Sequence, residues 1–275
     1  MFPAYTRALG AVPTMNVAYQ DAWRWKVEGA SAARLKVVGG MRDSESENIA
    51  ADLPGRDPKA GIIYLGCHHD TQANSVGADD NGSGVAGLLE LARVLAPRPR
   101  RRTIRLISFG TEEQLSVGSA AYVRRHRAEI AKHGKFIFNL DGYGSWMGWT
   151  ELVCNGPRQI EAFVRPYFDS RGQYAKFKGD VVPYADHFPF VAAGIPGVWL
   201  ARSNCTAGRF FHHRPDDDLT RVSTPRMAEL LESVAACITD LSNAPRLPFP
   251  ASVPPAYAKK VQHVWKDLFG GWKQA

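Results

Sequence analysis

The chain of 275 residues lacks several features that would each have assigned it to a class. Its apolar runs all stop well short of the roughly 20 residues that a membrane-spanning helix needs. Its four cysteines include no Cys-x-x-Cys pair, which favours free thiols in a reducing compartment, with a Cys154–Cys205 bridge left open. The first residues, MFPAYTRALG, lack the charged-then-apolar pattern of a secretory signal. We therefore expect a cytoplasmic protein, or a secreted one if this N-terminus is a shortened one.

The charge of the chain is basic but says little about a partner. A formal charge of +7 can indicate binding to nucleic acid or to a membrane surface. The densest basic run, PRPRRR at 97–102, has no aromatic residues among its arginines, so it lacks the stacking platform of single-strand binders. We interpret it as a solvated loop between a helix and a strand. We expect no nucleic-acid partner, although the charge weakly favours acidic substrates.

What the chain does contain is a repeated switch between short apolar runs and helical spacing. Alternating strands and helices predict an α/β fold, a mostly parallel mixed sheet flanked by helices on both faces. The predicted strands are 61–67, 103–110, 135–140, 150–155 and 195–201. The predicted helices are 85–95, 118–134, 157–168 and 225–241. Ligands of such sheets bind beyond the carboxyl ends of the strands.

Polar clusters follow these apolar runs, and four of the five come after a predicted strand. They are CHHDT at 67–71, GADDNGSG at 77–84, FGTEEQ at 109–114, NLDG at 139–142 and FHHRPDDDL at 211–219. Each has an ordinary explanation when it is taken alone: a polar strand end, a helix N-cap or an exposed acidic turn. The second cluster lacks the acid spacing of an EF-hand and the lysine of a phosphate-binding loop. Because four of the clusters come after predicted strands, we expect them to converge on one edge of the predicted sheet.

The residue types in these clusters are those of a metal-dependent hydrolase. His68 and Asp70 are two apart on a strand and face the same side, so a carboxylate can hold the second N–H of a metal-bound imidazole, while His69 points the other way. Glu112 and Glu113 are adjacent and diverge, so one can bind metal while the other faces a water. Two zinc ions that share one carboxylate need two histidines and three carboxylates, which the five clusters supply.

The order and spacing of the clusters resemble those of the co-catalytic zinc aminopeptidase family of peptidase clan MH. That family also includes glutamate carboxypeptidase II and glutaminyl cyclase. The resemblance covers roughly residues 46–243. It implies two zinc ions, or other divalent metals in their place, held by His68, Asp80, Glu113, Asp141 and His213.

The same resemblance implies roles for residues that do not bind metal. Glu112 matches the general base, Asp70 the partner of His68, and Asp186, in the segment ADHFPF, a residue of the substrate pocket. The family's ending runs His, three residues, Asp, one residue, then Leu or Ile, which selects His213 rather than His212 as the ligand. Many members carry Tyr at the position before that ligand. His212 stands there in this chain, and our hypothesis is that it donates a hydrogen bond to the oxyanion.

Two segments depart from the family's usual pattern. Leu115 and Ser116 stand where Gly-Leu is more common, which can reshape a pocket wall. Residues 11–25 resemble the closing strand and helix of a protease-associated lid domain of which almost everything upstream is missing. We therefore predict three parts: an N-terminal segment at 1–45, a peptidase domain at 46–243, and a Pro-rich linker with a C-terminal helix at 244–275 that packs on that domain.

The function implied by the resemblance is that of a zinc-dependent exopeptidase acting on peptides, most simply an aminopeptidase. The alternatives within the fold are a carboxypeptidase or dipeptidase and a glutaminyl cyclase, which uses one zinc ion. A non-catalytic binding domain is the alternative from another class, and it predicts lost ligands, whereas none is missing here. The sequence leaves residue specificity and oligomeric state open.

Overall fold

The computed structural model describes residues 15, 17–38, 43–203 and 210–272, and the chain divides into two compact units, Met1–Glu45 and Ser46–Ala275. The first unit contains helix α2 (Tyr19–Val27), which buries none of its side chains. This helix is the one expected within 11–25, while residues 11–14 and 16 lie outside the described residues.

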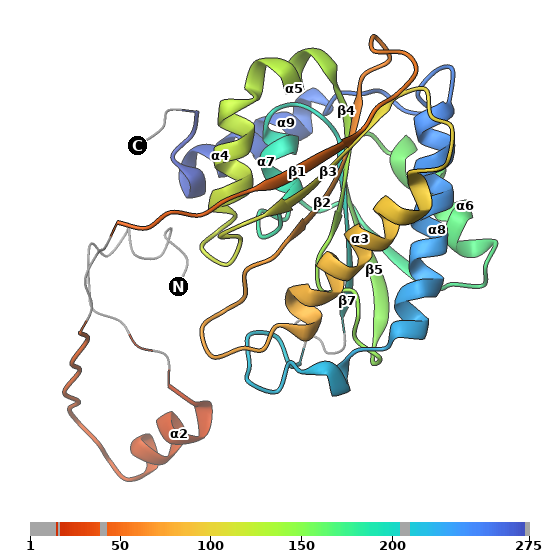
Figure 1. The fold of residues 1–275 in the computed structure, drawn as a ribbon. Coiled ribbons are helices and arrows are strands. Elements are labelled where there is room, and N and C mark those ends of the chain that lie inside the picture. Colours follow the sequence, from red (N-terminus) through yellow and green to blue (C-terminus); the bar gives the residue numbers. More distant parts are fainter. Residues whose placement is uncertain (1–14, 16, 39–42, 204–209, 273–275) are drawn as a thin grey trace. The chain divides into compact units, whose positions relative to one another are not determined.

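The second unit is an α/β structure whose strands and helices alternate along most of the chain (Figure 1). Its strands are β1 Ile49–Leu53, β2 Ile62–His68, β3 Thr103–Phe109, β4 Gly134–Leu140, β5 Trp149–Asn155, β6 Ala175–Lys178 and β7 Gly197–Ser203. Its helices are α3 Gly84–Leu95, α4 Val117–Arg125, α5 Arg127–His133, α6 Gln159–Asp169, α7 His187–Ala192, α8 Thr224–Asn243 and α9 Pro255–Phe269. Two short helical turns, η1 Ala78–Ser83 and η2 Leu219–Arg221, complete it.

The strands form one sheet of seven, in the order β1-β3-β2-β4-β7-β5-β6. Strands β3, β2, β4 and β7 run parallel, while β1 pairs with β3 and β5 pairs with β7 in the antiparallel sense. The predicted mostly parallel mixed sheet is therefore confirmed. Because β3, β2 and β4 are neighbours, the polar residues at their carboxyl ends are brought to one edge.

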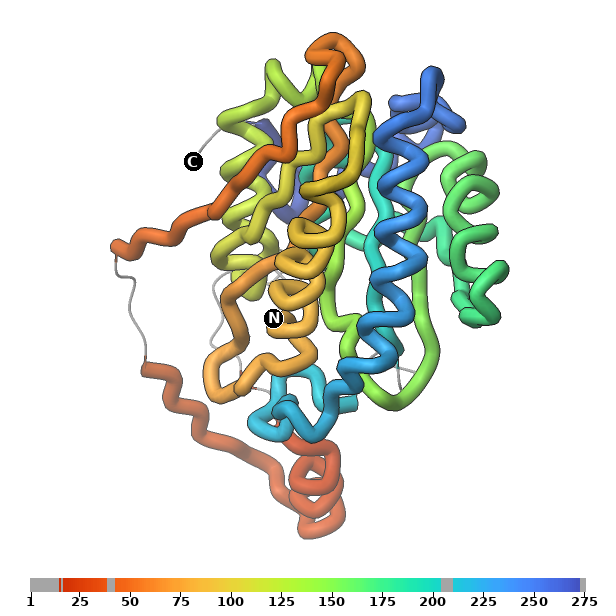
Figure 2. Tube along the Cα trace, turned by 45° about the vertical axis from the view of Figure 1, so that its right-hand side comes forward, coloured from red at the N-terminus to blue at the C-terminus, as the bar shows by residue number. Residues whose placement is uncertain are grey.

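Helices cover both faces of this sheet, as the apolar patterns predicted. Leu65 of β2 and Phe138 of β4 are buried on the face covered by α3, α6 and α8. Tyr64 and Ile137, one position earlier on each strand, are buried on the opposite face. Figure 2 shows α3 and α8 side by side on the first face. Each such side chain, fully removed from water, contributes roughly 1.5–3 kcal/mol to the free energy of unfolding. Within the described residues, no helix is long and apolar enough to cross a membrane.

The structure also differs from the predicted elements in four places. Strands β1 and β6 lie at the edges of the sheet and were not predicted, because four of the five residues of β1 are exposed and β6 has only four residues. The helix predicted at 118–134 is two helices, α4 and α5, which meet at His126 in a non-helical conformation. Helix α7 was not predicted, and all six of its residues are buried, so it carries no amphipathic pattern.

The basic run at 97–102 connects α3 to β3, as predicted, but part of it is not solvated. Arg102 is only 4% exposed, and its Nη1 donates to the carbonyl oxygen of Leu241 in the last turn of α8 at 2.9 Å. Arg100 Nη2 donates to the carbonyl oxygen of Leu95 at the end of α3 at 2.8 Å. A helix leaves its last four carbonyls without partners, and cations near them are stabilising. These arginines therefore cap two helices.

The C-terminal part of the chain packs on the same unit. Val261 and Trp265 of α9 are buried against Phe188 and Val191 of α7. Cys67, Cys154 and Cys237 are free thiols, and Cys205, the other half of the open Cys154–Cys205 bridge, lies outside the described residues. Helix α9 thus packs against α7, which begins immediately after Asp186.

Candidate metal centre

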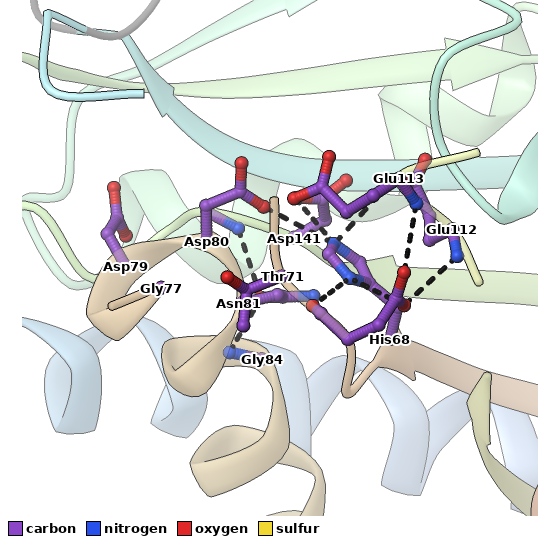
Figure 3. Close-up of polar contacts among 12 residues, drawn as sticks. His68, Thr71, Gly77, Asp79, Asp80, Asn81, Gly84, Glu112, Glu113 and Asp141 are labelled. Atoms are coloured by element: carbon purple, nitrogen blue, oxygen red, sulfur yellow. Dashed lines mark hydrogen bonds and ion pairs between the residues drawn. The ribbon is translucent and has the colours of Figure 1, made fainter. Parts of the chain in front are cut away.

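His68 is the last residue of β2, and its side chain is completely buried (Figure 3). Its Nδ1 lies 3.1 Å from the backbone carbonyl oxygen of Asp70, an oxygen that can only accept, so Nδ1 carries the proton. Nε2 lies 3.3 Å from Asp80 Oδ1 and 3.6 Å from Asp141 Oδ1. Burial lowers the pKa of His68, but the carboxylates of Asp141, Asp70 and Asp80 outweigh it and raise the pKa well above its ordinary value. Their charge favours a cation at Nε2, whether a proton or a metal ion.

The loop that carries Asp80 is fixed by its backbone. Gly77 has a left-handed φ of 69°, and a Cβ there would lie 2.7 Å from the carbonyl oxygen of Asp80. Asn81 accepts from the backbone N–H of Gly84 at 2.9 Å, and its Nδ2 donates to the carbonyl oxygen of Leu140 at 2.9 Å. Asn81 thereby joins the start of α3 to the end of β4, where Asp141 follows. Asp80 and Asp141 are buried, with 4% and 2% exposure.

Glu112 and Glu113 follow β3, and their side chains diverge. Glu112 Oε1 accepts from Ser116 Oγ at 3.1 Å, and its Oε2 lies 3.9 Å from His68 Nε2. Glu113 Oε2 instead lies 2.9 Å from His213 Nε2. Burial is the main reason that the pKa of Glu112 is raised well above its usual value, although the charge of His68 opposes it. A buried carboxyl with a raised pKa is suited to accepting a proton during a reaction.

Asp70 has a different set of contacts from the one predicted. Its carboxylate accepts the backbone N–H of Glu112 at 3.0 Å and that of Glu113 at 3.2 Å. The distance from its Oδ1 to His68 Nδ1 is 3.5 Å, longer than that from its own carbonyl oxygen. His68 Nδ1 thus lies beside both the carbonyl oxygen and the carboxylate of Asp70, and the carboxylate is also engaged by two amides. His69 points away from this centre, as predicted, and its Nδ1 lies 3.0 Å from Ser108 Oγ.

The two adjacent histidines of the 211–219 cluster both reach Asp80. His212 Nε2 lies 2.9 Å from Asp80 Oδ2, and His213 Nε2 lies 3.3 Å from the same oxygen. Only His213 is also beside Glu113 among the ion pairs of the described residues. Burial lowers the pKa of His213, but its contacts with Asp80 and Glu113 raise it to about 9. The contact with Glu113 favours His213 over His212 as a metal ligand.

These side chains make two groups of three metal-binding atoms, and both groups include Asp80. The first group is His68, Asp80 and Asp141, and the second is Asp80, His212 and His213; within each group the atoms lie within 4.8 Å of one another. Imidazole nitrogens and carboxylate oxygens are ligands that zinc accepts. The buried His68 Nε2 and Glu113 Oε1 have no hydrogen-bond partner among the described residues, as is expected of atoms that bind a metal ion. The residues present therefore fit zinc.

Asp186 belongs to neither of these two groups, although its charge interacts with that of His68. It was predicted to line the substrate pocket, and its side chain has no exposed surface. Burial is the main cause that raises its pKa to about 7. A small recess does open beside the second group, and Ser145, Phe211, His212 and Arg221 contribute to its walls. Asp186 is not among the residues that line this recess, and its predicted place in the substrate pocket stays a prediction.

The sequence prediction missed Asp217 and Asn81 as residues that hold the site together. Both act through backbone amides and carbonyls, which leave no side-chain spacing to read. Asp217 does match the Asp of the family's ending when it is counted from His213, but that match assigned it no role, and the acids at 216–218 were interpreted as a helix cap. That interpretation holds for Asp218, whose carboxylate accepts the N–H of Thr220 at 2.8 Å.

Comparisons with known proteins agree on one family. The family model described as peptidase family M28 matches residues 48–238. The chain is 27% identical to aminopeptidase YwaD of Bacillus subtilis over 94% of this chain and 57% of that protein. It is 28% identical to carboxypeptidase Q of Rattus norvegicus over 86% of this chain and 52% of that protein. The chain thus spans about half the length of these curated relatives.

Solved structures show the same similarity in three dimensions. The crystal structure of BSAP, a zinc aminopeptidase from Bacillus subtilis, superposes with a TM-score of 0.66 and 26% identity, over 76% of this chain and 52% of that one. The matched region of the family model includes β2, β3 and β4. It also includes all eight residues that were predicted to bind metal or to act in catalysis.

Proposed function

This chain belongs to peptidase family M28, and from that premise we propose that it is a zinc-dependent exopeptidase that removes N-terminal residues from peptides. The observation that carries the proposal is the pair of metal-binding groups that share Asp80, with Glu112 beside them. An aminopeptidase relative and a zinc aminopeptidase structure, each 26–27% identical, support the choice of reaction. The donor set is complete, which does not fit a non-catalytic binding domain.

We assign two zinc ions to this centre. His68 and Asp141 would hold the first, Glu113 and His213 the second, and Asp80 both, since each of its two oxygens lies toward a different histidine. Two ions that share a carboxylate typically lie about 3.5–4 Å apart. When bound, zinc would polarise the scissile carbonyl and lower the pKa of a water.

Glu112 would move the proton. Ser116 Oγ donates to Glu112 Oε1 and leaves Oε2, the oxygen nearer to His68, to accept a proton from the attacking water. The protonated carboxyl can then deliver that proton to the leaving amine. Its 9% exposure limits competition from bulk water. His212 would stabilise the developing oxyanion by donating a hydrogen bond, because it stands beside Asp80 without contacting Glu113.

A carboxypeptidase or dipeptidase is the second candidate, because carboxypeptidase Q is as similar to this chain as the aminopeptidases are. The two activities differ in the end of the peptide that they require. A glutaminyl cyclase structure also matches, at 21% identity, which speaks for the fold alone. The cyclase would need one metal ion and an N-terminal glutamine.

The experiment is a measurement of zinc content together with hydrolysis of a panel of substrates. The panel contains aminoacyl anilides, the same compounds with a blocked amine, C-terminally blocked and free dipeptides, and an N-terminal glutamine peptide. We expect two zinc ions per chain, chelator-sensitive cleavage of the free-amine substrates, and no cleavage of the blocked ones. Cleavage that requires a free carboxylate instead would identify the carboxypeptidase. Two bound zinc ions with no cleavage of any member would reject the peptidase function and leave the fold assignment intact.

A further inference from the structure

Asp217 differs from the acids on either side of it. Asp216 pairs with Arg214, from Arg214 Nε to Asp216 Oδ1 at 3.0 Å, and Asp218 caps η2. Both of these side chains lie at the surface or partly so, whereas Asp217 is 1% exposed. An ionised carboxylate is costly to bury unless it is hydrogen-bonded. The hydrogen-bond partners of Asp217 therefore indicate its role in the structure.

Those partners are backbone amides of the loop that carries Asp80. Asp217 Oδ1 accepts the N–H of Asp79 at 2.9 Å, and its Oδ2 accepts the N–H of Asp80 at 3.0 Å. The backbone carbonyl oxygen of Asp217 also accepts the N–H of Ala78 at 3.0 Å. Three hydrogen bonds thus join three consecutive amides to one residue of the segment that carries His212 and His213.

The arrangement follows from the conformation of the loop. The chain turns at Gly77 in the left-handed region and enters η1, so the first amides of η1 point outward with no carbonyl of their own turn to bond. Such amides carry a partial positive charge and favour a carboxylate. Both Asp217 oxygens are used in this way, so Asp217 is not itself a metal ligand.

Asp70 makes the same arrangement on the other ligand loop. Thr111 has a left-handed φ of 59°, and the next two amides, those of Glu112 and Glu113, donate to the two oxygens of Asp70. In both cases, a carboxylate from a different segment holds two consecutive amides, and the second of the two residues, Glu113 or Asp80, is a candidate metal ligand. Asp70 joins the end of β2 to the loop after β3, and Asp217 joins the 211–219 cluster to the loop after β2.

We propose that Asp217 is a positioning residue that holds Asp80 in register with His213 and so determines the affinity of the second metal position. This inference rests on the proposed function, in that it assumes the zinc assignment given above. His213 follows β7 at some distance along the chain, while Asp80 belongs to η1, so their 3.3 Å contact depends on links between the two segments. The first position shares Asp80, but its other ligands, His68 at the end of β2 and Asp141 after β4, are carried by strands that Asp217 does not join, so it depends less on Asp217.

The test compares zinc binding by the full chain and by Asp217→Asn. The asparagine keeps one acceptor oxygen and turns an N–H₂ toward a donating amide, so one of the two side-chain hydrogen bonds is lost. Mutation of a residue that orients a metal ligand typically lowers metal affinity by about 10–100-fold. We expect the second zinc equivalent to bind about 10–100-fold more weakly in chelator competition and the first, which shares Asp80, to weaken by clearly less. Added zinc should restore turnover, and the visible spectrum of the cobalt-loaded protein should lose the second equivalent's contribution.

Asp216→Asn and Asp218→Asn are the matched controls, because each neutralises an acid one position away that does not touch the loop. Both should bind two equivalents as the unchanged chain does. Asp217→Glu keeps both oxygens but displaces them by one methylene, so it should still weaken the second equivalent measurably, by less than Asp217→Asn does. If Asp217→Asn fails to fold, a second-equivalent affinity in Asp217→Glu equal to that of the unchanged chain overturns the proposal.

Other outcomes separate this inference from the proposed function. Unchanged affinity for both equivalents in Asp217→Asn, or an equal loss of both, overturns the positioning role, even if turnover falls. A lower melting temperature of the metal-free variant with unchanged zinc affinities would assign Asp217 a purely structural role and also overturns it. A selective loss of the second equivalent in a protein that cleaves no peptide supports the inference and rejects the proposed function alone.

Discussion

At the scale of single residues, Glu112 is the group whose chemistry can be separated from metal binding. Its Oε1 is held by Ser116 and its Oε2 faces His68, while Glu113 next to it contacts His213. Glu112→Gln keeps the size of the side chain and removes its ability to accept a proton. We expect kcat to fall by about 10²–10⁴-fold, the usual contribution of a general base, with zinc content unchanged. Retention of more than a tenth of kcat would remove Glu112 from this role, and Glu113→Gln, which should lose zinc, is the matched comparison.

The two adjacent histidines should respond differently when each is removed. His213 contacts both Asp80 and Glu113, whereas His212 contacts Asp80. His213→Ala should lose the second zinc equivalent. His212→Ala should keep both equivalents and lose about 10²-fold or more in kcat, the usual cost of a lost oxyanion donor. Zinc content and steady-state kinetics of the two variants check this. A drop of only a few-fold in His212→Ala would end the oxyanion hypothesis, and zinc loss in His212→Ala alone would exchange the two assignments.

Sequence could predict the ligands but not everything that holds them. His68, Glu112, Glu113 and Asp141 could be found because each directly follows or ends a buried apolar run, and such positions lie at one edge of a parallel sheet. Asp217 matched the Asp of the family's ending, but its role could not be predicted, because its partners are backbone amides that every loop possesses. The contact between the Asp70 carboxylate and two amides was missed for the same reason.

At the scale of elements, helix α9 lies outside the matched family region and packs on α7. Trp265 is 1% exposed, with its ring 4.9 Å from that of Phe269 and the guanidinium of Arg124 4.8 Å from its centroid. Trp265→Ala should lower the free energy of unfolding by about 3–5 kcal/mol, the usual cost of removing a large buried aromatic side chain. Urea unfolding measures it. His263→Ala, an exposed position of the same helix, should change it by less than about 0.5 kcal/mol, and equal effects of both would contradict the packing role.

The elements that escaped prediction share a physical cause. Strand β1 reads IAADL with four of its five residues exposed, so it shows no buried face, and its place is decided by pairing with β3. Helix α7 is buried on every side, and a six-residue buried helix cannot be told from a strand by periodicity. The central strands β2 and β4 were predictable because they are buried along almost their whole length.

At the scale of the whole molecule, the stability of the fold should depend on a buried histidine. His187 has no exposed surface, and its Nε2 donates to Asn155 Oδ1 at 2.9 Å. Burial lowers its pKa to about 3, so the folded protein keeps it neutral, while the unfolded chain protonates it near pH 6.5. Above pH 6.5 both states are neutral and the group has no effect. As pH falls from there toward 3, the unfolded state takes up the proton first and stability is lost.

The size of this effect can be measured against a variant that cannot titrate. Between pH 7 and pH 5, His187 should lower the free energy of unfolding by about 2 kcal/mol. His187→Gln keeps an N–H donor for Asn155 and removes the titration, so its unfolding free energy should fall by about that much less over the same interval. Urea unfolding at both pH values gives the comparison, in which the titration of other groups cancels. Parallel pH profiles for the two proteins would show that His187 is solvated or already charged in the fold.

The order of the strands has one more consequence. The candidate ligands other than His213 lie at or after the ends of three neighbouring strands, β3, β2 and β4, and hydrogen-bonded strands lie about 4.8 Å apart whatever their side chains. That spacing is close to the separation that two ions sharing a carboxylate require. The hydrogen bonds between the strands therefore fix the spacing of the loops that carry these ligands. If the proposed function holds, mutations in the surrounding loops would change which peptides bind without changing the spacing of the strands that carry these ligands.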